Sequence, residues 1–482
     1  MDFNYKFFST EVLKDLKRVA IITLIIGIGI LQKENPLLGL SSRMDSYSQD
    51  LFNNGVKYLP PFVSESLYPS HGQNKISVLL LTDQTVDGFF SGKWPISYSA
   101  HGRILNALLR YSPKAVVIDF LWLNSEKPGA IHLIRKLKKF KQKKIPVYLT
   151  FRKPNELMTF WPELKDLVIP VSPRIATDPT DFVARTYTIS SPNLPSPAVR
   201  VYQDFYDSNF PPYDAPDMQM FWGVKENPQN AAWMDQGDAQ DTILDLFTNG
   251  FSAVKYSPPY TTTVLVRDLL NPTAETQEMA HADLEKHLAG KVIFYGAQVT
   301  GASDVIYTPK RELRSGIYYH AMAFDNLISL EGRYKSDKIK KNLKNKHHLN
   351  DITLHIVILL FPSILIYVRH YKESKPNQTR TPESSRNTIL KLPQPGSPPS
   401  SKVFRTLKTY MVNTWGIISK WFFYRLLLYG WISFCVISCF YDLELAPRHW
   451  VGYALFAELS FYIDNIIRFE NAKSLMENKS NA

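Results

Sequence analysis

Four apolar runs, with a long polar segment between the first and the second, indicate the domain organisation of this chain. The first run covers residues 19–31, and the other three fall within residues 352–467. A helix needs about 20 apolar residues to cross a bilayer. The short first run is extended by neighbouring leucines and by basic side chains that reach toward the headgroups. We therefore predict four transmembrane α-helices, at 19–35, 351–368, 421–441 and 449–467.

Basic residues between the second and third runs predict the orientation of these helices. Residues 369–420 hold ten Lys or Arg against two acids, a net charge of +8 out of the +12 of the whole chain. A nucleic-acid partner would use such a stripe to neutralise phosphates. Its position next to membrane runs fits the positive-inside rule better, so we expect no nucleic-acid partner. The Pro/Ser-rich loop 369–420 and the termini 1–18 and 468–482 are then cytoplasmic.

Three charged residues fall inside the third and fourth predicted spans. They are Arg425 near the start of the third, and Glu458 and Asp464 in the fourth. Charged groups in a bilayer are costly and often functional. One interpretation is a polar contact to a partner helix or between Glu458 and Arg425. The other is an interfacial helix whose acids reach water or stay protonated. The pattern does not separate the two.

The segment 36–350 predicts an α/β domain outside the membrane. Short apolar runs alternate with stretches of helical periodicity, which is typical of a parallel-rich sheet with helices on both faces. Residues 204–262 break the alternation and indicate an irregular insert. The segment contains no cysteine, so a disulfide framework is excluded. The expected strands are 76–82, 115–120, 145–151 and 291–296, and the expected helices are 99–111, 130–141, 278–289 and 316–330.

Polar side chains follow several of these strands. Thr82 and Asp83 end the first, Asp119 ends the second, and the loop after residues 296–297 leads to Asp304. Ligands of open α/β sheets bind at the carboxyl ends of the strands, so a small-ligand site at this edge is one hypothesis. The alternative is that these residues cap turns and helices, which is the more common use of aspartate after a strand.

The order of several short motifs resembles the CHASE2 domain, an extracytoplasmic sensory domain of bacterial receptors. The resemblance covers about residues 20–368, and the last two spans fit it by topology. It implies a place in the bacterial inner membrane and adds Trp94 to the candidate ligand-binding residues. The motifs are Leu81-Thr82-Asp83-Gln84-Thr85, Lys93-Trp94-Pro95, Val117-Ile118-Asp119-Phe120, Gly296-Ala297 with Asp304 and Thr308-Pro309, Ser315-Gly316 with His320-Ala321, and Asp178 with Arg185.

Some positions depart from the family pattern. The chain has Thr82, Ile96 and Tyr98 where family members commonly have an acid, a tryptophan and an arginine. Members usually carry a kinase or cyclase region after the last helix, whereas few residues follow Arg468 here. His320, within the family-like stretch, is expected to have a packing role.

These features predict a multi-pass sensor or receptor-like subunit that signals through a separate partner protein. The alternative is a membrane-anchored scaffold of an envelope assembly, with the aromatic insert, including Trp222, as its contact surface. In both cases the partners are the bilayer and another protein, or a second copy of this chain. No hydrolase, nucleotide-binding or metal-site motif is present, so we expect neither enzymatic activity nor a cofactor or metal.

Overall fold

Most of the segment between residues 61 and 336 is described in the computed structural model. Residues 49–342 fold as one compact unit, which contains the sheet and the helices around it. The described ranges are 61–122, 129–211, 215–223, 259–271, 277–302, 304–309 and 312–336, together with Asn227, Asn230, seven residues between 46 and 56, Leu427, Gly430 and Trp431.

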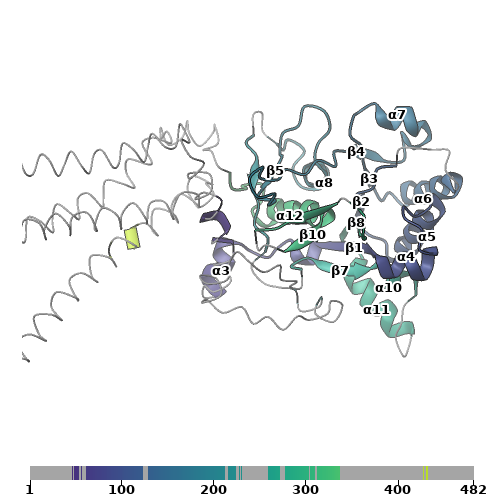
Figure 1. The fold of residues 1–482 in the computed structure, drawn as a ribbon, viewed down its shortest axis with the longest axis horizontal. Coiled ribbons are helices and arrows are strands. Elements are labelled where there is room, and N and C mark those ends of the chain that lie inside the picture. The colour runs from purple at the N-terminus through teal and green to yellow at the C-terminus, as the bar shows by residue number, and fades with distance from the viewer. Residues whose placement is uncertain are drawn as a thin grey trace, which may run out of the picture. The chain divides into compact units, whose positions relative to one another are not determined.

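A six-stranded sheet forms the centre of this unit (Figure 1). All neighbouring strands run parallel, in the order β4-β3-β2-β8-β1-β7. Two short antiparallel ribbons pair β5 with β6 and β9 with β10. The strands are β1 (Ile76–Thr82), β2 (Ala115–Ile118), β3 (Val147–Thr150), β4 (Ile169–Val171), β5 (Thr186–Tyr187), β6 (Met218–Gln219), β7 (Thr262–Leu265), β8 (Val292–Gln298), β9 (Val305–Tyr307) and β10 (Leu313–Ser315).

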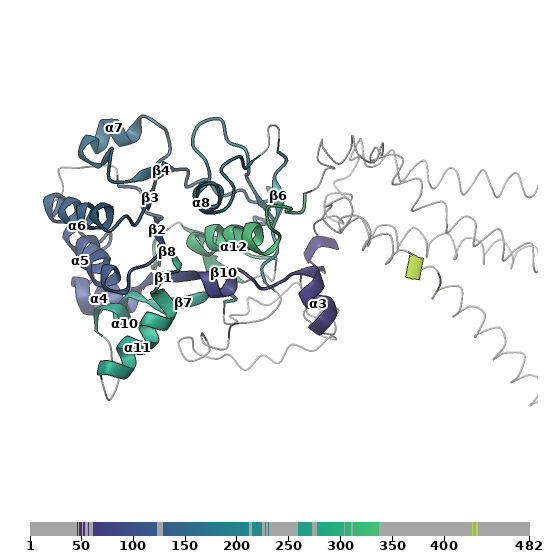
Figure 2. The same ribbon diagram turned by 180° about the vertical axis from the view of Figure 1, so that it is seen from behind.

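Helices cover both faces of the sheet, as the two opposite views show (Figures 1 and 2). The first face carries α4 (Asp83–Phe90), α5 (Tyr98–Leu108), α6 (Ala130–Gln142), α10 (Val266–Leu270) and α11 (Gln277–Leu288). The second face carries α8 (Pro197–Phe205) and α12 (Gly316–Ser329). The remaining helices are α3 (Pro61–Leu67), α7 (Glu156–Phe160) and the short 3₁₀ turns η2 (Gln73–Lys75), η3 (Leu109–Tyr111) and η4 (Pro162–Leu164).

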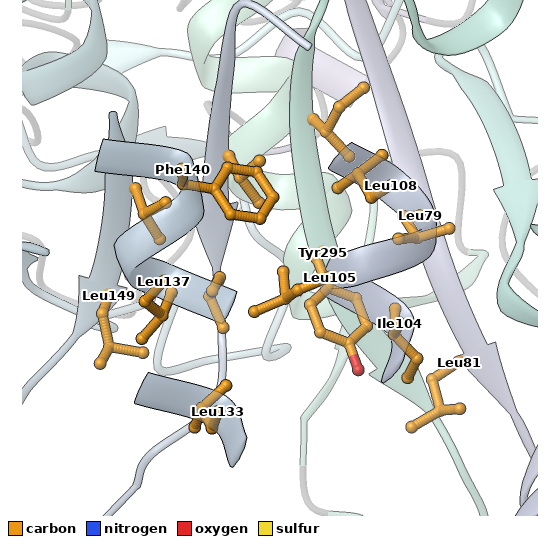
Figure 3. Close-up of a cluster of buried hydrophobic side chains, with 14 of the residues drawn as sticks. Leu79, Leu81, Ile104, Leu105, Leu108, Leu133, Leu137, Phe140, Leu149 and Tyr295 are labelled. Atoms are coloured by element: carbon orange, nitrogen blue, oxygen red, sulfur yellow. The ribbon is translucent and has the colours of Figure 1, made fainter. Parts of the chain in front are cut away.

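Alternation along the central strands explains why both faces are covered. Successive side chains of a strand point to opposite sides, so a strand that is apolar throughout must be buried on both. Leu79 and Leu81 of β1 join Tyr295 of β8 in the core beneath α5 and α6 (Figure 3). On the second face, Phe294 of β8 packs against Phe324 of α12, with ring centroids 5.9 Å apart.

Helix α12 is buried along its whole length, and all fourteen of its residues lie in the interior. Gly296 of β8 allows the helix to lie close to the sheet, because a Cβ there would be 2.5 Å from the Cβ of Ile317. Its polar side chains have partners: Asn326 donates to the Phe221 carbonyl oxygen (2.8 Å) and accepts from the Phe221 N–H (2.9 Å). This burial makes α12 the principal cover of the second face.

The predicted α/β class, with a parallel-rich sheet and flanking helices, is confirmed. All four predicted strands are present as β1, β2, β3 and β8, and all four predicted helices as α5, α6, α11 and α12. The pattern missed the two edge strands, β4 and β7. β4 contains Pro170, which is tolerated at a sheet edge. β7 begins where the irregular insert was expected to end, and Trp222 of that insert is buried and donates to the Ala184 carbonyl oxygen (2.9 Å).

No helix in the described part of the chain is long and apolar enough to cross a bilayer. The four predicted spans lie outside the described residues, apart from Leu427, Gly430 and Trp431 of the third. They stay predictions.

Replacing Gly296 by alanine should destabilise the chain by about 1–3 kcal/mol, because the added methyl group has to displace Ile317 of α12. Chemical denaturation of the purified full chain in detergent measures this. Gly88→Ala in α4 is the matched control: no atom lies within 4 Å of its new Cβ, and alanine favours a helix. Equal stability of Gly296→Ala and the unsubstituted chain would contradict the close packing of α12.

Candidate functional site

The carboxyl ends of β2 and β8 form a topological switch point of the sheet. After β2 the chain continues to α6 on the first face, whereas after β8 it passes through the β9–β10 ribbon to α12 on the second face. Neighbouring strands whose connections leave to opposite faces open a crevice between their ends, where α/β proteins bind ligands. Asp119 is the first residue after β2 and therefore lies at this switch point.

Asp119 is held at the end of β2 by its own backbone, since its N–H donates to the Tyr295 carbonyl oxygen (2.9 Å). Alternation directs its side chain toward the second face, where that side chain is only 8 % exposed. Burial raises the pKa of this carboxyl well above its usual range, and the neighbouring carboxyl of Asp304 raises it further. Removal from water disfavours the charged form, and so does a nearby like charge.

Asp304 approaches the same point from the loop between β8 and β9. Its carboxyl lies against the amino end of α12, in space that a side chain on Gly316 would occupy. The Gly316 N–H also donates to the Asp304 backbone carbonyl oxygen (3.0 Å). Burial raises the pKa of Asp304 to about 6, and the Gly316 N–H opposes part of that rise. The two acids therefore converge from different strand ends.

His320, one turn further along α12, faces Asp119. Its Nε2 atom lies 3.9 Å from Asp119 Oδ2, which is too far for a hydrogen bond. Nε2 has no hydrogen-bond partner among the described residues. Burial lowers the pKa of His320 to about 3, so the ring is neutral and this contact is not an ion pair.

Tyr187 fixes the other side of the imidazole. Its hydroxyl lies 2.9 Å from Nδ1 of His320 and accepts from the Ala198 N–H (3.2 Å). This arrangement favours donation of the tyrosine proton to Nδ1, because the hydroxyl then both accepts and donates. The neutral ring consequently carries its proton on Nε2, directed toward Asp119.

Together these groups form a buried acid pair beside a neutral histidine. Neither Asp119 nor Asp304 forms an ion pair with a lysine or arginine of the described residues. Within the same part of the chain, no group of three or more acids, histidines or cysteines could hold a metal ion. An acid pair without a counter-charge either retains a proton or binds a group that carries positive charge and donates hydrogen bonds.

Thr82 and Asp83 lie at the same edge but have other contacts. The Asp83 carboxylate accepts from the Thr300 N–H (3.0 and 3.1 Å) and from the Thr300 hydroxyl (2.8 Å). The Thr82 and Thr85 hydroxyls lie 3.1 Å apart. These bonds fix the β1–α4 junction to the loop after β8, whereas no side chain caps the start of α4. Strand β8 separates β1 from β2, so Asp83 and Asp119 are at least about 10 Å apart.

Trp94 lies near Asp119 but on the first face. Its ring packs against Phe120 at 6.4 Å, and Phe120 contacts His101 (4.8 Å) and Tyr295 (4.9 Å). Burial lowers the pKa of His101 to about 3, and its Nδ1 lies 3.0 Å from the Tyr295 hydroxyl. Trp94 thus belongs to an aromatic cluster that supports the residue after Asp119.

Of the five predicted ligand-site residues, the structure brings Asp119 and Asp304 together. The site contains two residues that sequence reasoning missed. His320 was expected only to pack, and Tyr187 comes from β5, 133 positions away along the chain. No local pattern marks that pairing.

The family model of the CHASE2 domain matches residues 20–361. The chain belongs to the CHASE2 domain family. This is an extracytoplasmic sensory domain family, which supports a sensor-like role. No curated protein and no solved structure matches the chain.

The Asp–Arg stretch of this CHASE2 domain forms a buried ion cluster. Arg185 is 3 % exposed and forms two hydrogen bonds to Asp50 (2.8 and 2.7 Å). It also contacts Asp178 (3.1 Å) and Asp181 (2.8 and 2.7 Å). Burial lowers the pKa of Arg185, but the hydrogen bonds to Asp50 and Asp181 outweigh it and the pKa is raised. The cluster attaches the segment around residue 50 to β5.

The three polar residues predicted within the spans, Arg425, Glu458 and Asp464, lie outside the described residues. Their roles stay predictions.

Between pH 4 and pH 7 the free energy of unfolding should fall less in Asp304→Asn than in the unsubstituted chain, by up to about 3 kcal/mol. The folded chain raises the pKa of Asp304 from 3.8 to about 6. The folded state therefore keeps a proton that the unfolded chain releases, and this stabilisation is lost as the pH rises through about 6. Asparagine does not titrate, so the variant lacks this loss.

Urea denaturation of the full chain in detergent at several pH values measures the difference. Asp87→Asn removes an exposed acid of α4 and serves as the control. If Asp87→Asn flattens the pH dependence as much as Asp304→Asn does, the change does not arise in the buried pair.

Proposed function

We propose that this CHASE2 protein is a non-enzymatic, multi-pass receptor subunit that binds a small cationic ligand at Asp119 and Asp304. The observation that carries the proposal is the pair of buried carboxyls at the switch point without a counter-charge among the described residues. A ligand ammonium or guanidinium group supplies that charge and donates hydrogen bonds to both acids. The protein responds by signalling through a separate partner.

Helix α12 offers a route from this site to both ends of the domain. Gly316 at its start adjoins the acid pair, whereas Asp325 lies about 14 Å further along the helix axis. There the Tyr68 hydroxyl, just after α3, donates to the Asp325 carboxylate. Binding at one end thus acts on the segments that lead to the predicted first and second spans.

A ligand changes the position of α12 only if it binds one of two positions of the helix more tightly than the other. Asp325 gives the far end a charge that depends on its surroundings, because burial raises the pKa of this carboxyl to about 7. Movement of Tyr68 away from Asp325 changes that protonation. Displacement of α12 is therefore the structural change that the proposal assigns to the signal.

A ligand-binding screen tests the site. We expect at least one compound in a panel of amines, guanidines and polyamines to raise the melting temperature of the full chain by roughly 5 °C. Asp119→Asn and Asp304→Asn should lose that shift, because the uncharged amide does not attract the cation. Asp87→Asn is the control with the same loss of one charge and should keep it. Stabilisation by anions alone, or by no compound in the panel, contradicts the proposal.

The scaffold alternative rests on a different observation. Phe182 is 65 % exposed in a left-handed backbone conformation, with φ at 59°. The next residue, Val183, bridges to Tyr307 of β9, which is itself exposed, as is Val305 of the same strand. Exposed apolar side chains of this kind occur at protein interfaces. A stable protein complex that is insensitive to Asp119→Asn favours the scaffold over the receptor.

The proposed topology places both termini and the loop 369–420 in the cytoplasm and the CHASE2 domain outside. A chain with Cys435 and Cys439 changed to serine provides a background without thiols. A membrane-impermeant maleimide should label Lys93→Cys, in the domain, on intact cells. It should label Ser397→Cys, in the loop, only after lysis. Labelling of Ser397→Cys on intact cells overturns this topology.

A further inference from the structure

Helix α6 carries a concentrated positive charge that the ligand site does not use. Seven Lys or Arg residues and no acid lie between positions 130 and 144. Leu133, Leu137 and Phe140 face the core, so the basic side chains occupy the outer side of the helix. We define the α6 basic face as Arg135, Lys136, Lys138, Lys139, Lys141, Lys143 and Lys144; all are exposed except Lys136, which is half-buried.

The neighbouring helix does not neutralise this face. α5 and η3 contain no acid and add the exposed Arg110. α5 lies close to α6 at Gly102, where a Cβ would be 2.5 Å from the His132 ring, and the Lys143 ammonium donates to the Leu109 carbonyl oxygen (3.3 Å). No residue of the α6 basic face forms a salt bridge with another described residue. The face therefore presents an uncompensated charge about 14 Å long.

The composition of the face indicates the class of its partner. Six of the seven cations are lysines, which are depleted at protein–protein interfaces, where arginine and aromatic residues are enriched. No aromatic side chain of α5, η3 or α6 is exposed, so nothing there stacks on nucleobases. A lysine ammonium instead pairs with phosphate as a point charge, without directional readout.

The position of the face argues against the bilayer. α6 lies on the first face of the sheet, whereas α3 lies on the same side as α12 (Figures 1 and 2). The last described residues of the domain, 335 and 336, pair with β6, which leads to Phe221, a hydrogen-bond partner of Asn326 in α12. Lys335 is fixed there by its carbonyl oxygen, which accepts from the Gln219 N–H (2.7 Å). α3 and the last described residues before the predicted second span thus lie on the other side of the sheet from α6.

We propose that the α6 basic face binds a linear polymer that carries phosphate groups along its length. A chain of regularly spaced anions meets several lysines at once along the helix and releases their counterions, so the affinity is strongly salt-dependent. This interaction is separate from the small-ligand site.

Fluorescence anisotropy of labelled inorganic polyphosphate, mixed with the full chain in detergent, tests the proposal. The triple variant K138Q, K139Q, K141Q should bind at least tenfold more weakly at low salt, and its log Kd should depend less steeply on log salt, by about 2. The control K93Q, K153Q, K165Q removes three exposed lysines outside the face and loses the same charge. Since residues 369–420 carry a further +8, the difference between these two variants is the readout.

Three outcomes overturn the proposal. The first is equal loss of affinity in both triple variants, which assigns binding to net charge alone. The second is binding of polyglutamate of the same length at least as tightly as polyphosphate, which indicates an acidic protein partner. The third is α6-dependent binding to vesicles with phosphatidylglycerol but not to polyphosphate, which indicates a membrane surface.

Discussion

The close contact between Gly296 of β8 and Ile317 of α12 determines the arrangement of the carboxyl edge of the sheet. A side chain larger than hydrogen at position 296 would hold the helix away from the sheet. With α12 in place, its first residue leaves room for the Asp304 carboxyl, and its second turn brings His320 beside Asp119. Beside this helix the Asp119 side chain is mostly buried and Asp304 is partly buried. Their raised pKa values are therefore a consequence of helix packing.

Burial of a charged aspartate costs free energy, and the domain offsets this cost in two different ways. At Arg185, one buried guanidinium donates hydrogen bonds to three carboxylates. At the switch point, Asp119 and Asp304 have no such cation among the described residues, and burial shifts their pKa upward instead. Buried carboxylates that are paired with an arginine are typical of a structural contact. Acids with a raised pKa and no such partner are typical of a functional site. This contrast is why we assign the ligand to the pair.

The two proposed interactions use opposite faces of one sheet. The acid pair adjoins the start of α12, and the end of α12 contacts Tyr68 just after α3, whereas the α6 basic face lies across the sheet from this helix. A small ligand and a polymer thus occupy different surfaces and need not compete. The sheet between them is apolar and closely packed, from Leu79 and Leu81 on one side to Phe294 on the other.

The sequence by itself determined the α/β class, the four central strands and four helices, and the acids that end the strands, because burial on both faces leaves continuous apolar runs in a strand. It also determined the positive charge of residues 130–144, which is a matter of composition. Only the tertiary structure separated Asp119 and Asp304 from Asp83, because that depends on the order of strands, with β8 placed between β1 and β2. It alone joined Tyr187 to His320 over 133 positions, since such contacts leave no local periodicity. The edge strands β4 and β7 likewise required tertiary pairing, because short strands at an edge have too few alternating positions to be recognised.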